Sequence, residues 1–320
     1  MTMSTVTRLN QSDITDRLPH KHENVLLDSI QYNESDNSVT LSLTIPNNDP
    51  LHRQIFTERL QTNQPKTIIS TVFTEIMALA SIVHASPLPP NTSVFFASIT
   101  DFELHQNHIA SQPLTGKVTH TLTKRNFVKY KGHLTTESNQ PIASATVMAI
   151  YTDSQPSTTT TTDQPNQLPP QNCDVKTDQS HWHRDNQFIV SDRLILSDPT
   201  TGSFSTEYTY PIDHPLTRGH FPDLPVMMGV QQWLGVADAC LTHAHHTNQS
   251  GHNQRTVNAT IYKSNGTIVS EISDCTVRFG HNTGDSPDYA YITKTKKVAF
   301  KQMVVPGETI IIHVTTDLPK

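Results

Sequence analysis

The chain has 320 residues, of which 34% are hydrophobic and 16% charged, and its 29 acidic and 23 basic side chains give a formal charge of −6. A net acidic chain argues against a dedicated nucleic-acid binder, which would carry a basic domain or stripe. The three cysteines are widely spaced without a C-x-x-C pair, which excludes a disulfide scaffold and the usual cysteine zinc sites. No signal peptide or membrane-spanning run is visible, so we expect a cytoplasmic protein without a membrane partner.

A segment rich in Ser, Thr, Gln, Pro and Asp divides the chain into halves of similar size. It has almost no apolar side chains to bury, which is typical of a flexible linker. The frame Pro-Leu-x-Arg-x-x-Phe occurs once in each half, at 50–56 and at 215–221, which indicates a duplicated domain. We therefore predict an N-terminal domain over 1–151, the linker over 152–180 and a C-terminal domain over 181–320.

The first half has the pattern of an α+β domain with one helix. Apolar side chains recur at helical spacing from Ile68 to Val83. Strand-like runs precede and follow this helix, with a turn-rich segment between the first two. The predicted strands are 25–30, 39–45, 95–102, 116–123, 126–135 and 143–151.

The second half repeats this order, with a helix at 228–242. A single helix among strands, twice over, favours an α+β fold over an alternating β-α-β one. The second half ends soon after its last strand, so we expect either a short C-terminal domain, a truncated chain, or compensating strands between Ile261 and Phe300. The predicted strands are 189–194, 203–210, 258–262, 267–278, 289–300 and 309–315.

The strongest local signal is the segment Gly219 to Val230, Gly-His-Phe-Pro-Asp-Leu-Pro-Val-Met-Met-Gly-Val, which leads directly into the second helix. His220 lies on a loop constrained by prolines, and Gly229 lies where the helix begins. Backbone N–H groups at a helix start lack partners and carry the positive end of the dipole. A histidine beside such donors suits proton removal next to a carbonyl group, whose developing negative charge the donors would stabilise. The competing interpretation is a surface histidine in a structural loop.

This segment closely resembles the H-F-P-x-x-P-V-M-x-G-V signature of (3R)-hydroxyacyl-acyl-carrier-protein dehydratases of the hotdog fold. The resemblance covers most of both halves, although it is patchy in the first. It implies a double hotdog: two antiparallel sheets, each wrapped around one central helix, as a pseudo-dimer in one chain. Supporting segments are Leu18-Pro19-His20-Lys21-His22, Val25 to Asp28, 96–99, 143–148 and Val304 to Glu308.

In that family a histidine pairs with a carboxylate fourteen residues further on, and the two come from opposite members of a dimer. In this chain the fourteenth residue after His220 is Leu234, so the second half lacks the carboxylate. The first half has Ile55 at the histidine position, but its helix keeps Glu75. Because the losses are complementary, we predict one composite site of His220 and Glu75. The alternative is that both halves lost their function independently.

The resemblance also implies the roles of these residues. His220 would remove the α-proton of a 3-hydroxyacyl thioester, and Glu75 would deliver a proton to the departing β-hydroxyl group. The N–H groups of Gly229 and Val230 would bind the thioester carbonyl, and Ser70 would be the counterpart of Gly229 in the lost site. No metal or organic cofactor is implied. The substrate tunnel would be lined by Phe221, Pro225, Val226 and Met227.

Three functions stay open. The leading one is a dehydratase (hydro-lyase) of fatty acid biosynthesis that acts on (3R)-hydroxyacyl chains carried by acyl carrier protein, or by CoA. The second is a catalytically inactive acyl-binding or partner subunit of another dehydratase, and the third and weakest is a hotdog acyl thioesterase. The position of Glu75 discriminates the first two, because facing His220 supports the enzyme and facing solvent supports the inactive partner. A thioesterase would place an acid beside the substrate carbonyl to activate water, and the only second acid in the His220 loop is Asp223. Further assembly of the pseudo-dimer is possible, and no nucleic-acid partner is expected.

Several weaker signals receive other interpretations. Asp238, one turn beyond Leu234, is an alternative carboxylate. The histidines of 243–246, with His252, have a spacing that could bind a metal, but their polar surroundings favour a solvated surface segment. We expect His20 and His22 to hold the N-terminal segment and Cys240 to be a small buried residue. A basic rim for an acidic carrier protein, with ordinary solvation as the alternative, would consist of Lys296, Lys297, Lys301 and Arg218.

Overall fold

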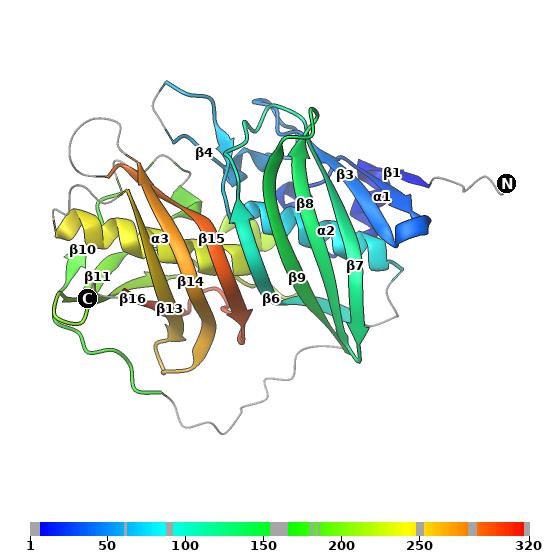
Figure 1. Cartoon of the computed structure of the whole chain (residues 1–320). Helices are drawn as coiled ribbons and strands as arrows, with labels where there is room; N and C mark the ends of the chain where they lie inside the picture. Colours follow the sequence, from blue (N-terminus) through cyan, green and yellow to red (C-terminus); the bar gives the residue numbers. More distant parts are fainter. Residues whose placement is uncertain are drawn as a thin grey trace.

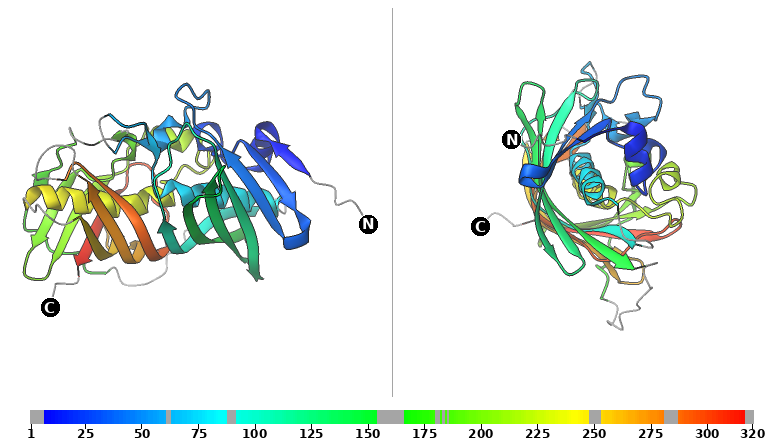
Figure 2. Two further views of the ribbon diagram at one scale, coloured as in Figure 1. Left: turned by 45° about the horizontal axis from the view of Figure 1, so that its top comes forward. Right: turned by 90° about the vertical axis from the view of Figure 1, so that its right-hand side faces the viewer.

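The computed structural model describes residues 7–60, 63–87, 92–153, 166–179, 182, 184, 186–247, 253–280 and 287–316. In this part of the chain, fourteen strands form one continuous curved sheet, and each half of the sheet wraps around one long helix (Figures 1 and 2). This is the predicted α+β double hotdog, with its two halves side by side. None of the helices in the described residues is both long and apolar enough to cross a membrane.

The first half begins with an edge strand and a short helix that the sequence patterns did not predict. Strand β1 (Arg8–Asn10) leads into helix α1 (Gln11–Arg17). A capping box between Asn10 and Asp13 caps the N-terminus of this helix. A seven-residue helix is too short for an apolar period to stand out. The other elements are η1 (His22–Asn24), β2 (Ser29–Asn33), η2 (Glu34–Asp36), β3 (Ser38–Leu43), η3 (Arg53–Phe56), β4 (Thr57–Glu58), β5 (Thr67–Ile68), α2 (Val72–Ala85), β6 (Thr92–Leu104), β7 (Leu114–Lys124), β8 (Phe127–Thr136) and β9 (Pro141–Asp153).

The second half repeats this plan around helix α3 (Gly229–His246). Residues 154–165 of the predicted linker lie outside the described residues. The later part of that segment is docked, because Val175 and Lys176 pair with strand β11. The elements are β10 (Val175–Lys176), η4 (Asn186–Phe188), β11 (Arg193–Asp198), β12 (Ser203–Thr209), η5 (Pro215–Arg218), α3, β13 (Gln254–Lys263), β14 (Ile268–Gly280), β15 (Tyr289–Phe300) and β16 (Thr309–Thr316).

The two halves use the same sheet positions in a different chain order. From their boundary outward, the first half contributes β6, β9, β8, β7, β3, β2 and β1, and the second contributes β15, β14, β13, β16, β12, β11 and β10. Strands β6 and β15 pair antiparallel across the boundary, with Ile99 opposite Val298. Strand β6 directly follows its helix, whereas β15 is the third strand after α3. The three strands of this sheet before each helix therefore keep their sheet positions, whereas the four strands after it fill the same four positions in a cyclically shifted order. The second half contributes seven strands to the sheet, as the first does, and the strands between Ile261 and Phe300 supply the compensation that was one of the three alternatives.

The predicted strands at 25–30 and 189–194 are also wrong for most of their length. Val25, Leu26 and Leu27 are buried, but the ladder of β2 starts only at Ser29. In the second half β11 likewise starts at Arg193. An apolar run shows that a segment is buried, but it does not show whether its backbone pairs with a neighbour.

The core is continuous between the halves. Helix α2 is buried on every side from Val72 to Val83, so it lies inside the protein and not on its surface. Trp233 of α3 packs edge-on against Phe102 of β6, with the ring centroids 4.9 Å apart. The two helices thus lie against one shared sheet, and residues at their N-terminal ends can meet between the halves (Figure 1).

Candidate active site

His220 lies on the loop between η5 and α3, and a hydrogen bond fixes one of its ring nitrogens. Its Nδ1 lies 2.9 Å from the carbonyl oxygen of Val226. Since a carbonyl oxygen only accepts, Nδ1 carries the proton and Nε2 keeps its lone pair. Burial lowers the pKa of His220 to about 4, so the imidazole is neutral at pH 7. A neutral imidazole with a free nitrogen can act as a base.

The His220 loop is locked onto the N-terminal segment of the other half. The N–H of Lys21 donates to the carbonyl oxygen of Gly219 at 2.8 Å. A Cβ on Gly219 would come within 2.2 Å of the Lys21 carbonyl oxygen, so only glycine allows this approach. Phe221 has a φ of 54°, a value that is rare for a bulky side chain. Such strain is typical of functional sites.

Glu75 comes from the first turn of α2, in the first half. Its side chain is 2% exposed, and burial raises its pKa to about 8. The carboxyl group is therefore protonated at neutral pH. Its Oε2 has no hydrogen-bond partner among the described residues. A protonated carboxylic acid in such surroundings can serve as a general acid.

The structure adds His20 to the site. Its Nε2 lies 3.7 Å from Oε1 of Glu75, and its ring centroid lies 5.3 Å from that of His220. Burial, and then the neighbouring His220 and Lys21, keep the pKa of His20 well below its ordinary value. We expected His20 only to hold the N-terminal segment, although the motif around it was a signal for the site. His22, two residues later, is exposed.

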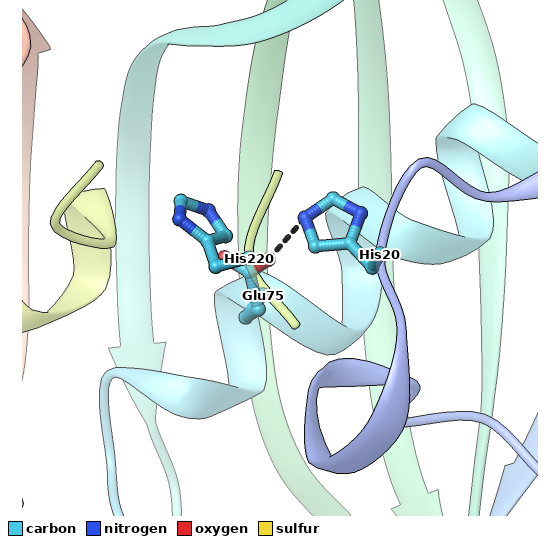
Figure 3. Close-up of side chains that lie close together, drawn as sticks. All are labelled: His20, Glu75 and His220. Carbon is cyan, nitrogen blue, oxygen red and sulfur yellow. Dashed lines mark ion pairs between the residues drawn. The ribbon is translucent and has the colours of Figure 1, made fainter. Parts of the chain in front are cut away.

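His20, Glu75 and His220 form a buried cluster between the halves (Figure 3). One nitrogen or oxygen atom of each lies within 4.8 Å of the others. His20 and Glu75 belong to the first half and His220 to the second. The structure therefore brings together the two residues that the complementary losses singled out.

The start of helix α3 supplies backbone donors beside this cluster. The N–H groups of Gln231 and Gln232 donate to the carbonyl oxygen of Met228. The N–H groups of Gly229 and Val230 come earlier in the helix. They have no acceptor within it, because no helical turn precedes them. Gly229 lines the same cavity as His220, and a Cβ on it would lie 3.0 Å from the Phe300 ring.

A cavity of about 740 Å³ contains the cluster. On α2, Ala78 and Ile82 line it one and two turns beyond Glu75, so it follows that helix away from the carboxyl group. Most of the lining from the first half is apolar, from β6, β8 and β9. The lining from the second half is more polar near the connection of β15 to β16, where Lys263, Lys301, Gln302 and Glu308 occur.

The predicted tunnel residues divide into two groups. Phe221, Val226 and Met227 line the cavity. Pro225 is exposed and does not line it, whereas Leu224, the residue before it, does. The side chain of Val230 is buried, and this residue also lies outside the cavity lining.

The second site of the duplication holds a buried ion cluster. Leu234 is fully buried and Ile55 is partly buried in the core. Arg184 lies eight residues before Asp192, as His20 lies eight residues before Asp28, so the two positions correspond. Arg184 lies 2.7 Å from Asp238 and 3.5 Å from Glu58. Burial raises the pKa of Glu58 to about 7 and also raises that of Asp238, which the Arg184 charge partly offsets.

The remaining candidates have structural surroundings. Asp238 also accepts the N–H of Val190 at 2.7 Å and does not line the cavity, so it is not a substitute acid there. Ser70 accepts the N–H of Ile292 at 3.3 Å, away from His220. Cys240 is buried, and burial raises its pKa.

The histidine tract and the basic rim do not form sites of their own in the described residues. His243 is buried and stacks on Phe204, with the centroids 4.2 Å apart, while His252 lies outside the described residues. Lys301 lines the cavity but pairs with Glu271 at 2.7 Å, and Lys296 pairs with Asp274 at 3.5 Å. Arg218 donates to the carbonyl oxygen of Pro215.

No protein-family model and no curated protein matches the chain. Among the solved structures that resemble it is the dehydratase domain from the CurK module of curacin polyketide synthase, at 12% sequence identity and a TM-score of 0.44, over 84% of this chain and 95% of that one. The dehydratase heterocomplex ApeI:P from Xenorhabdus doucetiae matches at 19% identity and a TM-score of 0.36, over 45% and 92%. A thioesterase, HI1161 from Haemophilus influenzae, matches at 14% sequence identity and a TM-score of 0.30, over 40% of this chain and 80% of that one. At these identities and scores the matches assign no activity to this chain.

Proposed function

We propose that the protein is a dehydratase that removes water from (3R)-hydroxyacyl thioesters to give trans-2-enoyl thioesters. The observation that carries the proposal is that His220 and Glu75, from opposite halves, face each other in one cavity in complementary protonation states. Loss of water across a carbon–carbon bond needs a base for the α-proton and an acid for the hydroxyl group. A neutral imidazole and a protonated carboxyl group supply that pair at neutral pH.

The reaction begins at the α-carbon. Nε2 of His220 takes the α-proton, while Nδ1 keeps its hydrogen bond to Val226. The N–H of Gly229, at the start of α3, stabilises the negative charge that develops on the thioester oxygen. The low pKa of His220 in the free protein rises when negative charge forms beside it, so the imidazolium is stabilised as the reaction proceeds.

Glu75 completes the elimination. Its proton passes to the β-hydroxyl group, which leaves as water, and the carbon–oxygen bond breaks as the double bond forms. The resulting carboxylate and the imidazolium of His220 offset each other's charge inside the cavity. His20, 3.7 Å from Glu75, is a neutral polar group that can hydrogen-bond to this carboxylate.

The cavity supports an apolar acyl chain on a polar carrier. The lining along α2 suits hydrocarbon, and the polar lining near Lys301 suits the amide-containing arm of a carrier. We propose acyl carrier protein as the carrier, with CoA as the alternative, and fatty acid biosynthesis as the setting. The basic rim gives little support to contact with an acidic carrier protein, because Lys301 and Lys296 each pair with an acidic side chain of this chain.

The two other candidate functions have less support. A partner subunit without catalysis has no need for a buried carboxyl group whose pKa is raised to about 8, because that burial costs stability at neutral pH. A thioesterase of this fold would use a carboxylate that activates water beside the thioester carbon. Glu75 is protonated at neutral pH, and Asp223, on the His220 loop, is exposed.

The test is the appearance of the conjugated enoyl thioester from (3R)-hydroxyacyl substrates of several chain lengths, on carrier protein and on CoA. We expect turnover by the wild type and its loss in His220→Ala and in Glu75→Gln. Release of free thiol without an enoyl product would favour the thioesterase. No product of either kind with any substrate would favour the inactive subunit.

A further inference from the structure

We propose that the His20–Glu75–His220 cluster is also a binding site for a divalent transition metal ion, Zn²⁺ above all, and that this ion inhibits the reaction by occupying its acid and its base. The inhibition rests on the proposed function, whereas the binding does not. The cluster is the one group of three such side chains with converging ligand atoms in the part of the chain that the structure describes.

The donor set matches what Zn²⁺ binds. Two imidazole nitrogens and one carboxylate oxygen form a common set of three protein ligands, with a fourth position left for water. Ligand atoms around a tetrahedral Zn²⁺ lie about 3.4 Å apart, given bonds of about 2.1 Å. The atoms of His20 and Glu75 already lie 3.7 Å apart, and all three lie within 4.8 Å of one another. No pair of these atoms needs to approach by more than about 1.4 Å to reach the tetrahedral spacing.

The two histidines are prepared as ligands. Both are buried, with His20 beside Glu75 and its ring 5.3 Å from that of His220. The Nδ1–H of His220 is held by the Val226 carbonyl, which leaves Nε2 as the donor. This outer hydrogen bond to a backbone carbonyl is the one that metal-binding histidines commonly make.

The cluster also contains polar atoms that lack partners. Nδ1 of His20 and Oε2 of Glu75 are buried without a hydrogen bond to any described residue. Buried polar atoms of this kind are rare, and each calls for a ligand, a water or an ion. The cavity provides room for the fourth ligand beside them. The corresponding place in the other site holds Arg184, whose positive charge would repel a cation.

A bound ion would stop the proposed reaction through the same atoms. Zn²⁺ on Nε2 of His220 takes the lone pair that removes the α-proton. Zn²⁺ on Glu75 replaces the proton that the carboxyl group gives to the leaving hydroxyl. The ion and the substrate would therefore exclude each other.

The experiment titrates the full-length, tag-free protein with Zn²⁺ by calorimetry and with Co²⁺ by visible absorption. We expect one equivalent of strong binding, which His20→Ala and Glu75→Gln each weaken by about 100-fold or more. His20→Gln, which keeps the size and hydrogen bonding of the side chain, should also bind weakly, and circular dichroism checks that each variant is folded. The matched control is the double variant His245→Gln with His246→Gln, which removes two histidines of the separate tract and should bind as the wild type does.

Three results would overturn the proposal. Wild-type protein without an equivalent of bound ion would exclude the site. Binding that survives His20→Ala but disappears in the control variant would assign the ion to the tract. Turnover that Zn²⁺ raises, and that a chelator lowers, would exclude inhibition. If the wild type catalyses no dehydration in the presence of a chelator, the proposed function is wrong. The titrations would still decide whether the metal site exists.

Discussion

The two sites that the duplication placed between the halves have opposite chemistry. One holds two neutral histidines and a protonated carboxyl group beside a cavity, and the other holds Arg184 between Glu58 and Asp238. In the first site the ionisable groups lack full hydrogen bonding, whereas in the second they neutralise one another. The comparison teaches that equivalent places between two similar halves can hold different chemistry. In the second place an ion pair joins the halves, since Glu58 comes from the first and Arg184 from the second.

The largest expected effect is on turnover, at the site with the cavity. His220→Ala and Glu75→Gln should each reduce kcat by roughly 10²- to 10⁴-fold, because each removes one partner of the proton transfers. The measurement is the steady-state rate of enoyl thioester formation. His313→Gln, on β16, keeps a hydrogen-bonding group near Ser205 and serves as the histidine control. Equal loss in this control would mean that the effects arise from folding.

The next effect is on stability, at the site with the ion pair. Arg184→Met should lower the free energy of unfolding by about 3–5 kcal/mol, because Glu58 and Asp238 would remain buried without their cation. Urea unfolding at pH 7 measures the change. A companion variant that also carries Glu58→Gln and Asp238→Asn should recover much of the lost stability. If it does not, the loss does not arise from the buried acidic groups that Arg184 pairs with.

A third prediction links the pKa of Glu75 to stability. Its folded-state pKa of about 8 exceeds the ordinary value of 4.5, so the unfolded chain ionises first. Ionisation favours the unfolded state, and the folded protein should therefore lose stability progressively as pH rises from about 4.5 to about 8. Glu75→Gln should stabilise the protein at pH 7 by up to ~3 kcal/mol and flatten this dependence. Thermal melts from pH 5 to 8 measure this difference. The prediction would be contradicted if the Tm of the wild type and the Tm of Glu75→Gln changed by the same amount with pH.

The same ionisations predict the pH profile of turnover. His220 must be neutral, so the rate should fall below about pH 4, where the fold permits measurement. Glu75 must be protonated, so kcat/KM should fall as pH rises through about 8. A rate that rises above pH 8 would mean that Glu75 acts as a base.

The smallest expected effect is on chain length. Ala78 lines the cavity one turn beyond Glu75, and Ala78→Val would narrow the apolar part. The ratio of kcat/KM for long over short acyl chains should fall by about 10-fold, which corresponds to the effect of one or two methyl groups in a pocket. Competition between two substrates of different length measures this ratio directly.

The sequence by itself predicted the architecture and the pairing of His220 with Glu75. The internal repeat and the two helix periods are local patterns, and they indicated a duplicated α+β domain. The resemblance of the segment from Gly219 to Val230 to the dehydratase signature then implied a double hotdog whose halves meet at one remaining site. The structure has this fold and places the two side chains together. Their catalytic roles remain a proposal.

Only the tertiary structure decided the rest. The permuted strand order of the second half depends on which strands pair over long distances, and apolar runs carry no information about their partners. His20 and Arg184 occupy corresponding positions in the sequence, yet one lies in the cavity and the other in an ion cluster. Protonation states likewise follow from burial and from neighbours far apart in the chain, which a list of residues does not contain.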